Sequence, residues 1–501
     1  MRKKLLSILV FSILVAPTLV GCGSSPSTLT ILSITEGDVS VMKAGTASWI
    51  EVEAGMSLEV GDSIKTGDNS SAKITFFDGS TITLQAGTEI EIASLDISTD
   101  TGSTTVTLEQ TIGNTISRVE KLVDPASRYE VETPTGVVAV RGSAMQVYVI
   151  EDGTTWAINL EGDIRVVAQG VELQIPEGQQ CIVRPDQPPE LVVEVTFSNP
   201  NLEAAVRDAI AVSTGPIYSS DLGELTYLDA SARNITDLTG LEYATVLTTL
   251  NLMNNQIGDI SPLADLTSLT TLNLVNNQIS NISPLAGLTT LTGLWLNDNQ
   301  ISDISPLAGL MNLTGLGLNR NQISDISPLA GLTSLTGLWV AHNQISDISP
   351  LANLTGLRDL YSGDNQISDI SLLVNLNSLR DLSIGGNPIG DISLLANLTS
   401  LTELDIRSAQ ISDISPLSNL TGLTRLELGN NQIGDILALA NLASLTELYL
   451  WDNQISDILP LVENAGLGAG DTVDLELNPL SSDSITIYIP QLQARGVTVN
   501  Y

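Results

Sequence analysis

This sequence predicts an N-terminal all-β domain followed by an α/β-type solenoid of leucine-rich repeats. Leucine recurs every 22 residues between about residues 225 and 461, for example at Leu250, Leu272 and Leu294. Residues 29–193 instead contain short segments of alternating apolar and polar residues, separated by turn residues. Units of such a repeat fold only by stacking on their neighbours. We therefore expect a parallel β ladder on the concave face of the solenoid, with short 3₁₀ or irregular segments on its convex side.

The first residues have the pattern of a secretion signal. Three basic residues precede an apolar run over residues 5–15, and Leu19-Val20-Gly21-Cys22 follows where cleavage is expected. This pattern is typical of a bacterial lipoprotein signal peptide with a lipobox. We expect residues 1–22 to be this signal, Cys22 to be lipidated and residues 23–28 to be a spacer. The protein would then be extracytoplasmic and membrane-anchored, on the cell surface or the periplasmic face. An ordinary signal peptide or an uncleaved anchor is the alternative.

The composition argues against several classes of function. The chain has 57 acidic and 20 basic residues and a net charge of −37, whereas nucleic-acid binding depends on Lys and Arg that neutralise phosphates. One histidine and two cysteines leave no His-based catalytic triad and no His/Cys zinc site. We therefore expect no enzyme activity, no cofactor, no metal site and no nucleic-acid partner.

The all-β domain, residues 29–193, is expected from its hairpin signals. Asp78-Gly79 lies between two alternating segments, and Asp152-Gly153 lies between two more; this dipeptide is a strong signal for a tight hairpin turn. Residues 115–122 are the one segment here whose apolar spacing is compatible with a helix. The region is of ordinary single-domain size.

Five motifs of this β segment stand in a characteristic order: Gly55-Met56-Ser57-Leu58, the run over residues 61–67, Phe76-Phe77-Asp78-Gly79-Ser80, Thr133-Pro134-Thr135-Gly136 and Val140-Arg141-Gly142-Ser143. They resemble the motifs of a known family, the FecR-type periplasmic sensor domain. The resemblance covers nearly the whole segment and implies a sensor module. Typical members of the family carry a transmembrane helix and a cytoplasmic part that controls a sigma factor. The sequence shows neither feature, so we expect a stalk or a second binding module.

Proline residues and a helix-capping signal mark the boundaries of the solenoid in the sequence. A Pro-rich linker is expected over residues 184–194, because proline stiffens the chain and cannot join a β ladder. Asn199 and Pro200 mark a helix start within an N-terminal cap over residues 195–241. The 22-residue repeats then occupy residues 242–470, and residues 471–501 form a C-terminal cap.

Within each repeat, two leucines of a short strand point inward, and the residues between and beyond them lie on the concave face. The Ser-Pro dipeptide, for example Ser261-Pro262, is expected to provide the cap and first residue of a convex turn. One asparagine and one aspartate recur in almost every unit, and we expect the asparagine to bond backbone groups and the aspartate to cap a turn rather than bind calcium. The asparagine row breaks at Ala409, and Ser362 stands where its equivalents are Leu, Ile or Val.

The repeats and their caps resemble the internalin subclass of bacterial leucine-rich repeats from about Phe197 to Tyr501. The resemblance rests on the 22-residue pattern, on Leu228-Asp229-Ala230 at the first repeat and on the closing segment from Asn478-Pro479-Leu480-Ser481 to Arg495-Gly496-Val497. It implies recognition of a partner on the concave strand face.

The residues of that concave face are found by adding the repeat length of 22 to each outward-facing position of the first strand. They divide it into an aromatic half and a charged half, and the ligand-binding candidates are Trp295, Trp339, Tyr361, Asp405, Arg407, Glu427, Tyr449 and Trp451. Exposed Trp and Tyr are effective anchors in interfaces. Trp295 and Trp339 stand two strands apart, so we expect a separation of about 10 Å. Asp405 and Glu427 also have the residue types of a glycosidase pair, but a solvated strand face gives no reason for raised pKa values.

Two functions are compatible with this sequence. The first is a surface-anchored lipoprotein that binds a protein or carbohydrate ligand through the concave face, for adhesion or recognition, and is held to the membrane by its N-terminal lipid. The second is an envelope sensor or signalling accessory that uses the FecR-like domain. A pulldown with each domain separately would discriminate between them.

Overall fold

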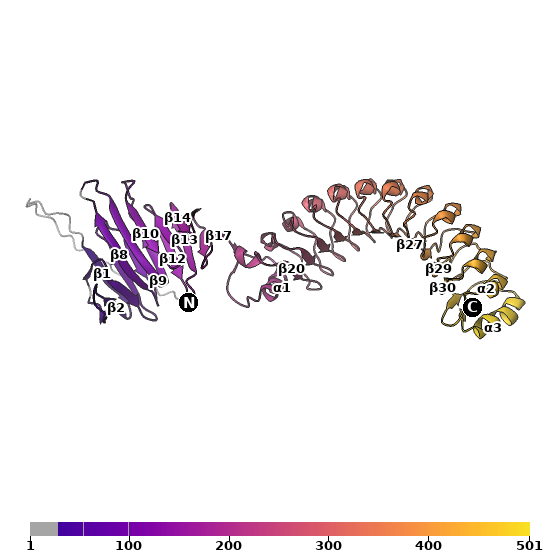
Figure 1. The fold of residues 1–501 in the computed structure, drawn as a ribbon, viewed down its shortest axis with the longest axis horizontal. Helices are drawn as coiled ribbons and strands as arrows, with labels where there is room; N and C mark the ends of the chain where they lie inside the picture. Colours follow the sequence, from indigo (N-terminus) through magenta and orange to yellow (C-terminus); the bar gives the residue numbers. More distant parts are fainter. Residues whose placement is uncertain (1–28, 54, 99) are drawn as a thin grey trace, which may run out of the picture. The chain divides into compact units, whose positions relative to one another are not determined.

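The computed structural model describes residues 29–53, 55–98 and 100–501 (Figure 1). The expected signal, lipidation site and spacer lie outside these residues. The chain divides into two compact units, one ending at Val193 and the other spanning Glu194–Tyr501. Each unit has its own hydrophobic core. Within the described ranges, no helix is long and apolar enough to cross a membrane.

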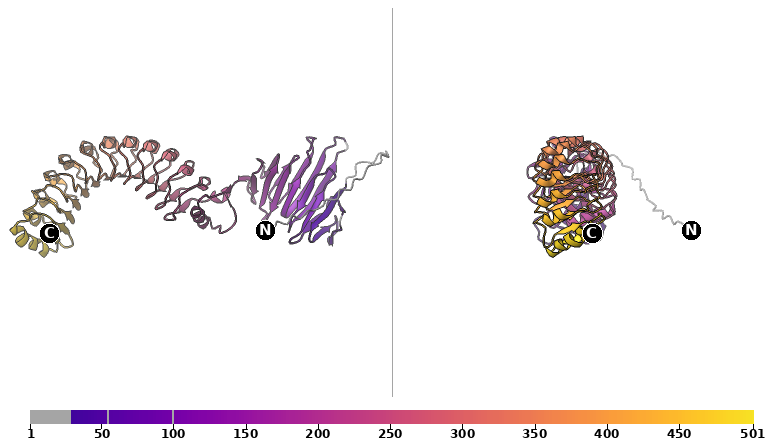
Figure 2. Two further views of the ribbon diagram at one scale, coloured as in Figure 1. Left: turned by 180° about the vertical axis from the view of Figure 1, so that it is seen from behind. Right: turned by 90° about the vertical axis from the view of Figure 1, so that its right-hand side faces the viewer.

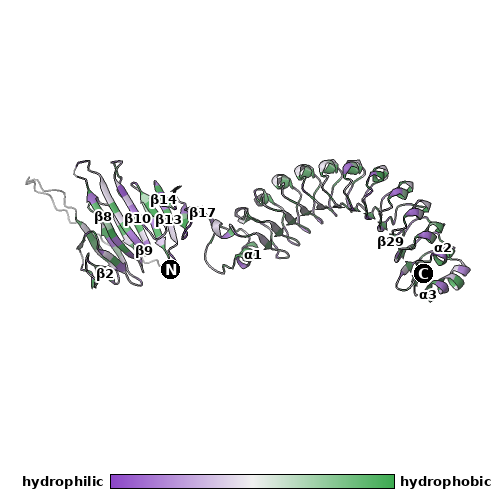
Figure 3. Cartoon of the chain, in the orientation of Figure 1, coloured by the Kyte–Doolittle hydropathy of each residue, from purple (hydrophilic) through white to green (hydrophobic). Residues whose placement is uncertain are grey.

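The described residues of the first unit form 17 strands. They are β1 (Thr30–Glu36), β2 (Val39–Met42), β3 (Trp49–Glu51), β4 (Met56–Leu58), β5 (Ser63–Thr66), β6 (Ser71–Thr75), β7 (Thr81–Leu84), β8 (Glu89–Ile97), β9 (Thr104–Arg118), β10 (Arg128–Glu132), β11 (Val137–Val140), β12 (Ala144–Val149), β13 (Thr155–Glu161), β14 (Ile164–Ala168), β15 (Val171–Ile175), β16 (Gln180–Val183) and β17 (Glu190–Val192). Hydrophilic and hydrophobic residues alternate along these strands (Figure 3), as expected when one face of each strand is buried.

Strand β9 joins two layers of this unit. Its first part pairs with β8 and β10, and its second part, from Gly113 onward, pairs with β7 and β12. Gly113 adopts a φ of +95° at the point of change, and a Cβ there would lie 2.3 Å from the Cα of Thr88. Only glycine fits this position, because the φ is unfavourable and the neighbouring backbone is too close.

Two of the sequence expectations for this unit are confirmed and two are wrong. The hairpins β6–β7 and β12–β13 form around the Asp-Gly dipeptides as predicted. The helix considered for residues 115–122 is absent, because residues 115–118 complete β9 and pair on both sides. Residues 190–192, placed by the sequence in a linker, form strand β17. This strand pairs with β16, so that Leu191 packs against the core.

The second unit is a solenoid with a 13-stranded parallel sheet. Its strands are β20 (Tyr227–Asp229), β21 (Thr249–Asn251), β22 (Thr271–Asn273), β23 (Gly293–Trp295), β24 (Gly315–Gly317), β25 (Gly337–Trp339), β26 (Asp359–Tyr361), β27 (Asp381–Ser383), β28 (Glu403–Asp405), β29 (Arg425–Glu427), β30 (Glu447–Tyr449), β31 (Thr472–Asp474) and β32 (Thr498–Asn500). The strands line the inner side of the arc that this unit forms (Figure 1; Figure 2). Equivalent residues pair directly, as Trp339 does with Tyr361.

The outer side of the arc carries short helices. They are the 3₁₀ helices η2 (Leu241–Tyr243), η3 (Ser261–Leu263), η4 (Ser283–Gly287), η5 (Ser305–Gly309), η6 (Ser327–Gly331), η7 (Ser349–Asn353), η8 (Ser371–Asn375), η9 (Ser393–Asn397), η10 (Ser415–Asn419) and η11 (Leu437–Asn441), followed by α2 (Leu459–Glu463). Between the strands and these helices lies one continuous core of leucine and isoleucine. The predicted parallel ladder with short convex segments is therefore confirmed.

Both ends of this core are covered. At the N-terminal end, β18 (Glu194–Val195) pairs with β19 (Ile217–Tyr218), and η1 (Ser219–Leu222) precedes the first repeat. Helix α1 (Pro200–Ile210) buries Leu202 and Val206, and the Asn199 side chain caps it as predicted. At the other end, the π-helix η12 (Ser484–Tyr488) and α3 (Ile489–Ala494) precede β32. These elements shield apolar surface that no further repeat covers.

The recurring asparagine joins each repeat to the one before it. In a regular unit, Asn343 Nδ2 donates to the carbonyl oxygens of Leu318 and Val340, at 3.0 and 3.1 Å, and its Oδ1 accepts from the backbone N–H of Ile323 at 3.0 Å. One amide therefore satisfies backbone groups on two successive turns. The expected bonding to backbone groups is confirmed, but the second turn belongs to the preceding repeat and not to the next one. Buried backbone groups without such partners would be costly.

The recurring aspartate caps the convex turn. The Asp303 carboxylate accepts from the backbone N–H of Ser305 at 2.8 Å, and Asp347 makes the same bond with Ser349. These bonds lower the pKa values of both carboxyls. The aspartates thus cap turns as expected, whereas the serine was wrongly expected to be the cap. Ser261 and its equivalents are the first helical residues, and the aspartate two residues earlier supplies the bond.

The turn before Ala409 has been rebuilt around the missing asparagine. Ile389 N–H, the counterpart of Ile323 N–H, donates to Asn387 O at 2.9 Å, and Gly390 N–H donates to Ala409 O at 3.0 Å. Ala409 itself is fully buried. The second irregularity, Ser362, is also fully buried, and its Oγ has no hydrogen-bond partner among the described residues.

We expect Ala409→Asn to destabilise the protein, because the larger side chain enters a filled site whose backbone groups already have partners. The cost should be about 1–3 kcal/mol. Asn343→Ala is the matched change at a regular position and should cost about 1–3 kcal/mol for the opposite reason, the loss of a partner for Ile323 N–H. Thermal and denaturant unfolding of the full chain measure both effects. A higher melting temperature for Ala409→Asn would show that this turn can return to the regular geometry.

Candidate functional site

Three aromatic side chains form a contacting cluster on the concave face. The ring centroids of Trp295 and Trp339 are 5.3 Å apart, and the Trp339 and Tyr361 rings stack at 6.0 Å with an interplanar angle of 14°. All three side chains are half-buried although none belongs to the solenoid core. The expected separation of about 10 Å for the two tryptophans is therefore wrong for their rings, which touch.

Glycines explain this contact. A Cβ at Gly317, between the two tryptophan strands, would lie 2.7 Å from Trp295 Cε3, and a Cβ at Gly337 would lie 2.4 Å from Trp339 Cη2. The rings thus occupy space that side chains at these two positions would fill. The glycines at these positions provide the room in which the large rings meet.

A chain of charged side chains occupies the following strands. Arg407 lies 3.2 Å from both Asp405 and Glu427, and Arg425 contacts Glu427 at 2.6 Å and also pairs with Glu447. Each arginine thus bridges two acidic groups on neighbouring strands. Networks of several ion pairs contribute more than isolated surface ion pairs. These side chains form a continuous network from β28 to β30.

Tyr449 and Trp451 extend the face at the C-terminal end of this network. The Arg425 guanidinium lies 5.1 Å from the centroid of the Tyr449 ring, and the Tyr449 hydroxyl donates to Glu447 at 3.2 Å. The Trp451 indole lies over Gly429, where a Cβ would be 2.2 Å from its Cε2. The structure therefore joins Tyr449 to the ion-pair network, while Trp451 lies apart from the aromatic cluster.

Asp405 is more enclosed than the sequence indicated. Its side chain is 17% exposed, and it accepts a hydrogen bond from Ser383 Oγ at 3.0 Å. Burial raises the pKa of this carboxyl, although the Arg407 backbone N–H and guanidinium act in the opposite direction. The expectation that this strand face gives no reason for a raised pKa is therefore wrong at Asp405. The carboxylate is held by Ser383 and Arg407, and nothing in this arrangement shows catalytic activity.

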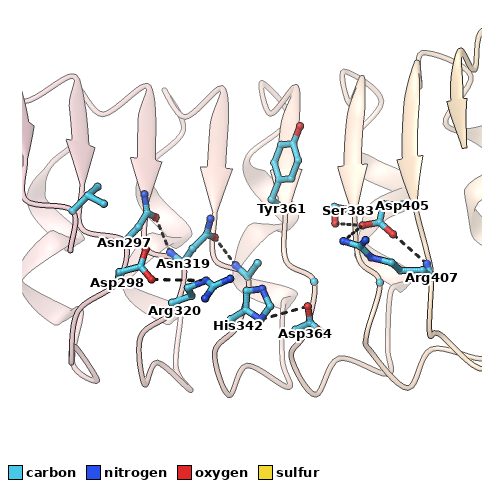
Figure 4. A pocket seen from close by; sticks show the side chains of 14 residues that line it. Asn297, Asp298, Asn319, Arg320, His342, Tyr361, Asp364, Ser383, Asp405 and Arg407 are labelled. Atoms are coloured by element: carbon cyan, nitrogen blue, oxygen red, sulfur yellow. Dashed lines mark hydrogen bonds and ion pairs between the residues drawn. The ribbon is translucent and has the colours of Figure 1, made fainter. Parts of the chain in front are cut away.

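A groove of about 350 Å³ connects the two halves of the face (Figure 4). Tyr361 stands in it between Asn319 on one side and Ser383, Asp405 and Arg407 on the other. Small residues at Gly363 and Gly385 leave the space open. Of the eight candidates, the groove brings together Tyr361, Asp405 and Arg407.

The eight candidates omit seven polar residues of this groove: Asn297, Asp298, Asn319, Arg320, His342, Asp364 and Ser383. Arg320 and His342 have φ values of +54° and +55°. Asn, Asp and Gly fill this left-handed position in most other repeats, because they adopt it at least cost. The sequence did contain a signal for Arg320, because an arginine stands at a repeat position that is otherwise mostly Asn or Asp. A residue that fits this backbone conformation poorly is often kept for a function.

Comparison with known proteins agrees with both parts of the fold. Residues 62–165 match the family model described as FecR protein. Residues 245–287, 289–331, 333–375, 377–419, 399–441 and 421–463 match the model described as Leucine Rich repeats (2 copies). No curated protein matches the chain. The chain is thus a leucine-rich repeat protein with an N-terminal FecR domain.

Solved structures identify the repeat family. An internalin (InlF) from Listeria monocytogenes is 39% identical, with a TM-score of 0.58, and the match covers 61% of this chain and 88% of that one. Internalin C2 from the same organism is 41% identical, with a TM-score of 0.42, over 43% of this chain and 98% of that one. The chain belongs to the internalin family of leucine-rich repeat proteins.

We expect Gly317→Ala to displace the Trp295 indole, because the new methyl group would overlap it. The expected result is a changed near-ultraviolet circular dichroism spectrum and a loss of stability of about 1–3 kcal/mol. Gly309→Ala is the matched control, since a Cβ there meets nothing within 4 Å. Unchanged spectra for Gly317→Ala would mean that the indole does not lie over this glycine in solution.

Proposed function

We propose that this protein is a surface-anchored lipoprotein that recognises an extracytoplasmic partner through the concave face of its repeats, in adhesion or recognition. The contacting cluster of Trp295, Trp339 and Tyr361 carries the proposal. Large aromatic side chains on a solvent-facing sheet do not serve the core, and Trp and Tyr dominate the energetics of interfaces. The membership of the internalin family supports a binding role for the repeats.

Anchoring rests on the sequence around Cys22. A lipid at this residue would hold the protein at a membrane with the FecR domain between the anchor and the repeats in the chain. Two or more acyl chains on one cysteine hold a protein stably at a membrane, whereas a single acyl chain does not. The FecR match and the internalin-type repeats both support an extracytoplasmic location.

We expect Cys22→Ala to abolish lipoprotein processing, because the acceptor thiol is gone. The variant should lose its N-terminal modification by mass spectrometry, and any cleaved product should leave the membrane fraction. Cys181→Ala is the matched control, since this buried cysteine lies in the FecR-containing unit and should not affect fractionation. Membrane association and N-terminal mass that do not differ from those of the unaltered chain would contradict the proposed anchor.

We expect Trp339→Ala to weaken partner binding by about 2 kcal/mol or more, since the residue is central in the aromatic cluster. It should also cost about 1–3 kcal/mol of stability, because its ring contacts two others. Binding to the partner recovered by crosslinking and pulldown with the full chain is measured below the unfolding temperature of the variant. Tyr243→Ala, on the convex side, is the control and should bind normally. Normal binding by Trp339→Ala would place recognition elsewhere, first on the network around Asp405, Arg407 and Glu427.

The second candidate function is an envelope sensor or signalling accessory, and the FecR match over residues 62–165 favours it. In this role the first unit would contact a membrane partner and relay the occupancy of the repeats. Because each unit has its own core, the two can be used separately as baits in envelope extracts. A transporter or signalling protein recovered on residues 29–193 supports the sensor. Recovery of partners on the repeat unit alone supports the binding lipoprotein.

A further inference from the structure

The groove beside Tyr361 presents hydrogen-bond donors whose direction is fixed. Asn297 Oδ1 accepts from the backbone N–H of Asn319 at 2.8 Å, and Asn319 Oδ1 accepts from the backbone N–H of Ala341 at 2.7 Å. Because each amide oxygen is held by the next repeat, each Nδ2 must point away from that bond. Within residues 29–53, 55–98 and 100–501, neither Nδ2 donates to another residue. Two oriented donors therefore flank the groove from positions two residues beyond strands β23 and β24 (Figure 4).

Each basic side chain of the groove has a carboxylate within 4 Å. Arg320 Nε lies 3.8 Å from Asp298 Oδ1, His342 Nδ1 lies 3.4 Å from Asp364 Oδ2, and Arg407 Nη2 lies 3.2 Å from Asp405 Oδ2. A polyanion needs basic groups that are free to pair with it, whereas both arginines of the groove already stand beside carboxylates. The groove therefore favours a ligand that has many polar atoms and no negative charge.

The apolar part of the groove combines one aromatic side chain with two small aliphatic ones. Tyr361 is the aromatic lining residue, and Val275 and Ala341 are the aliphatic ones. Tyr361 forms a wall of the groove, and Trp339 stacks behind it. An aromatic wall of this kind offers a flat face on which a ring-shaped ligand can pack.

We propose that this groove binds a neutral oligosaccharide. The proposal rests on the proposed function of the concave face as the recognition surface. The C–H face of a sugar ring packs on an aromatic side chain, and each hydroxyl both donates and accepts, so it fits between a paired donor and acceptor. The volume of about 350 Å³ lies at the small end of ligand sites, so the groove holds a short stretch of a glycan.

Asn319→Asp separates the role of the amide in binding from its role in the fold. The aspartate keeps an oxygen for Ala341 N–H but loses the outward donor. Asn273→Asp is the matched control, because Asn273 Oδ1 also accepts a backbone N–H, that of Val275 in its own repeat at 3.1 Å, and the residue does not line the groove. Both variants change the charge of the concave face equally. Tyr361→Ala removes the aromatic wall independently.

The test uses the full chain in detergent on an array of neutral oligosaccharides, with titration calorimetry on the glycan that binds. We expect Asn319→Asp and Tyr361→Ala each to weaken binding about tenfold or more, whereas Asn273→Asp binds within about twofold of the unaltered chain. Melting curves confirm that each variant is folded at the temperature of measurement.

Three outcomes overturn the proposal. The first is that the protein binds no neutral oligosaccharide on the array. The second is that it binds acidic glycans or basic peptides in place of neutral glycans. The third is that neither Asn319→Asp nor Tyr361→Ala changes glycan binding. If no neutral oligosaccharide binds but Trp339→Ala abolishes binding of a protein partner, the glycan proposal fails and the proposed recognition function stands. If no neutral oligosaccharide binds and Trp339→Ala also leaves partner binding unchanged, the glycan proposal and the proposed recognition function both fail.

Discussion

The buried asparagine amide of each repeat is the interaction on which the solenoid depends. Except at Ala409, it bonds backbone groups of its own turn and of the preceding repeat, so neighbouring strands are held in register. Packed leucines alone would allow a repeat to rotate or slip, because apolar contact has little directional preference. The amide bonds remove that freedom. A fixed register is what turns a periodic sequence into an ordered concave surface.

That register decides which side chains meet on the concave face. Equivalent positions become neighbours on adjacent strands, so a change at one position alters the surroundings of two others. The tryptophan rings touch because glycines occupy intervening positions, and the arginines bridge carboxylates because Asp405, Glu427 and Glu447 follow on successive strands. The result is a surface with an aromatic part, an ion-pair network and a groove shared by both. The face is thus ordered before any partner arrives, which reduces the entropy lost on binding.

The exceptions to the repeat lie close to this groove. Ser362 is buried beneath the strand of Tyr361, and the rebuilt turn that replaces the asparagine bonds at Ala409 begins in the repeat of Ser383. Arg320 and His342 occupy left-handed positions that suit Asn or Asp better. Departures from local preference cost stability and tend to gather at functional sites. Their position supports the groove as the part of the face under functional constraint.

The sequence by itself determined the solenoid, its parallel ladder, the asparagine and aspartate roles and the column of concave aromatics, because a strict period places equivalent residues at equivalent positions. It also indicated the FecR domain through turn motifs. Only the tertiary structure decided that the rings of Trp295 and Trp339 touch, that Asp405 is enclosed, and that Asn297 and Asn319 point donors into a groove. A period fixes where a Cα lies, whereas side-chain direction, burial and pKa depend on what the neighbouring strands leave empty or occupied.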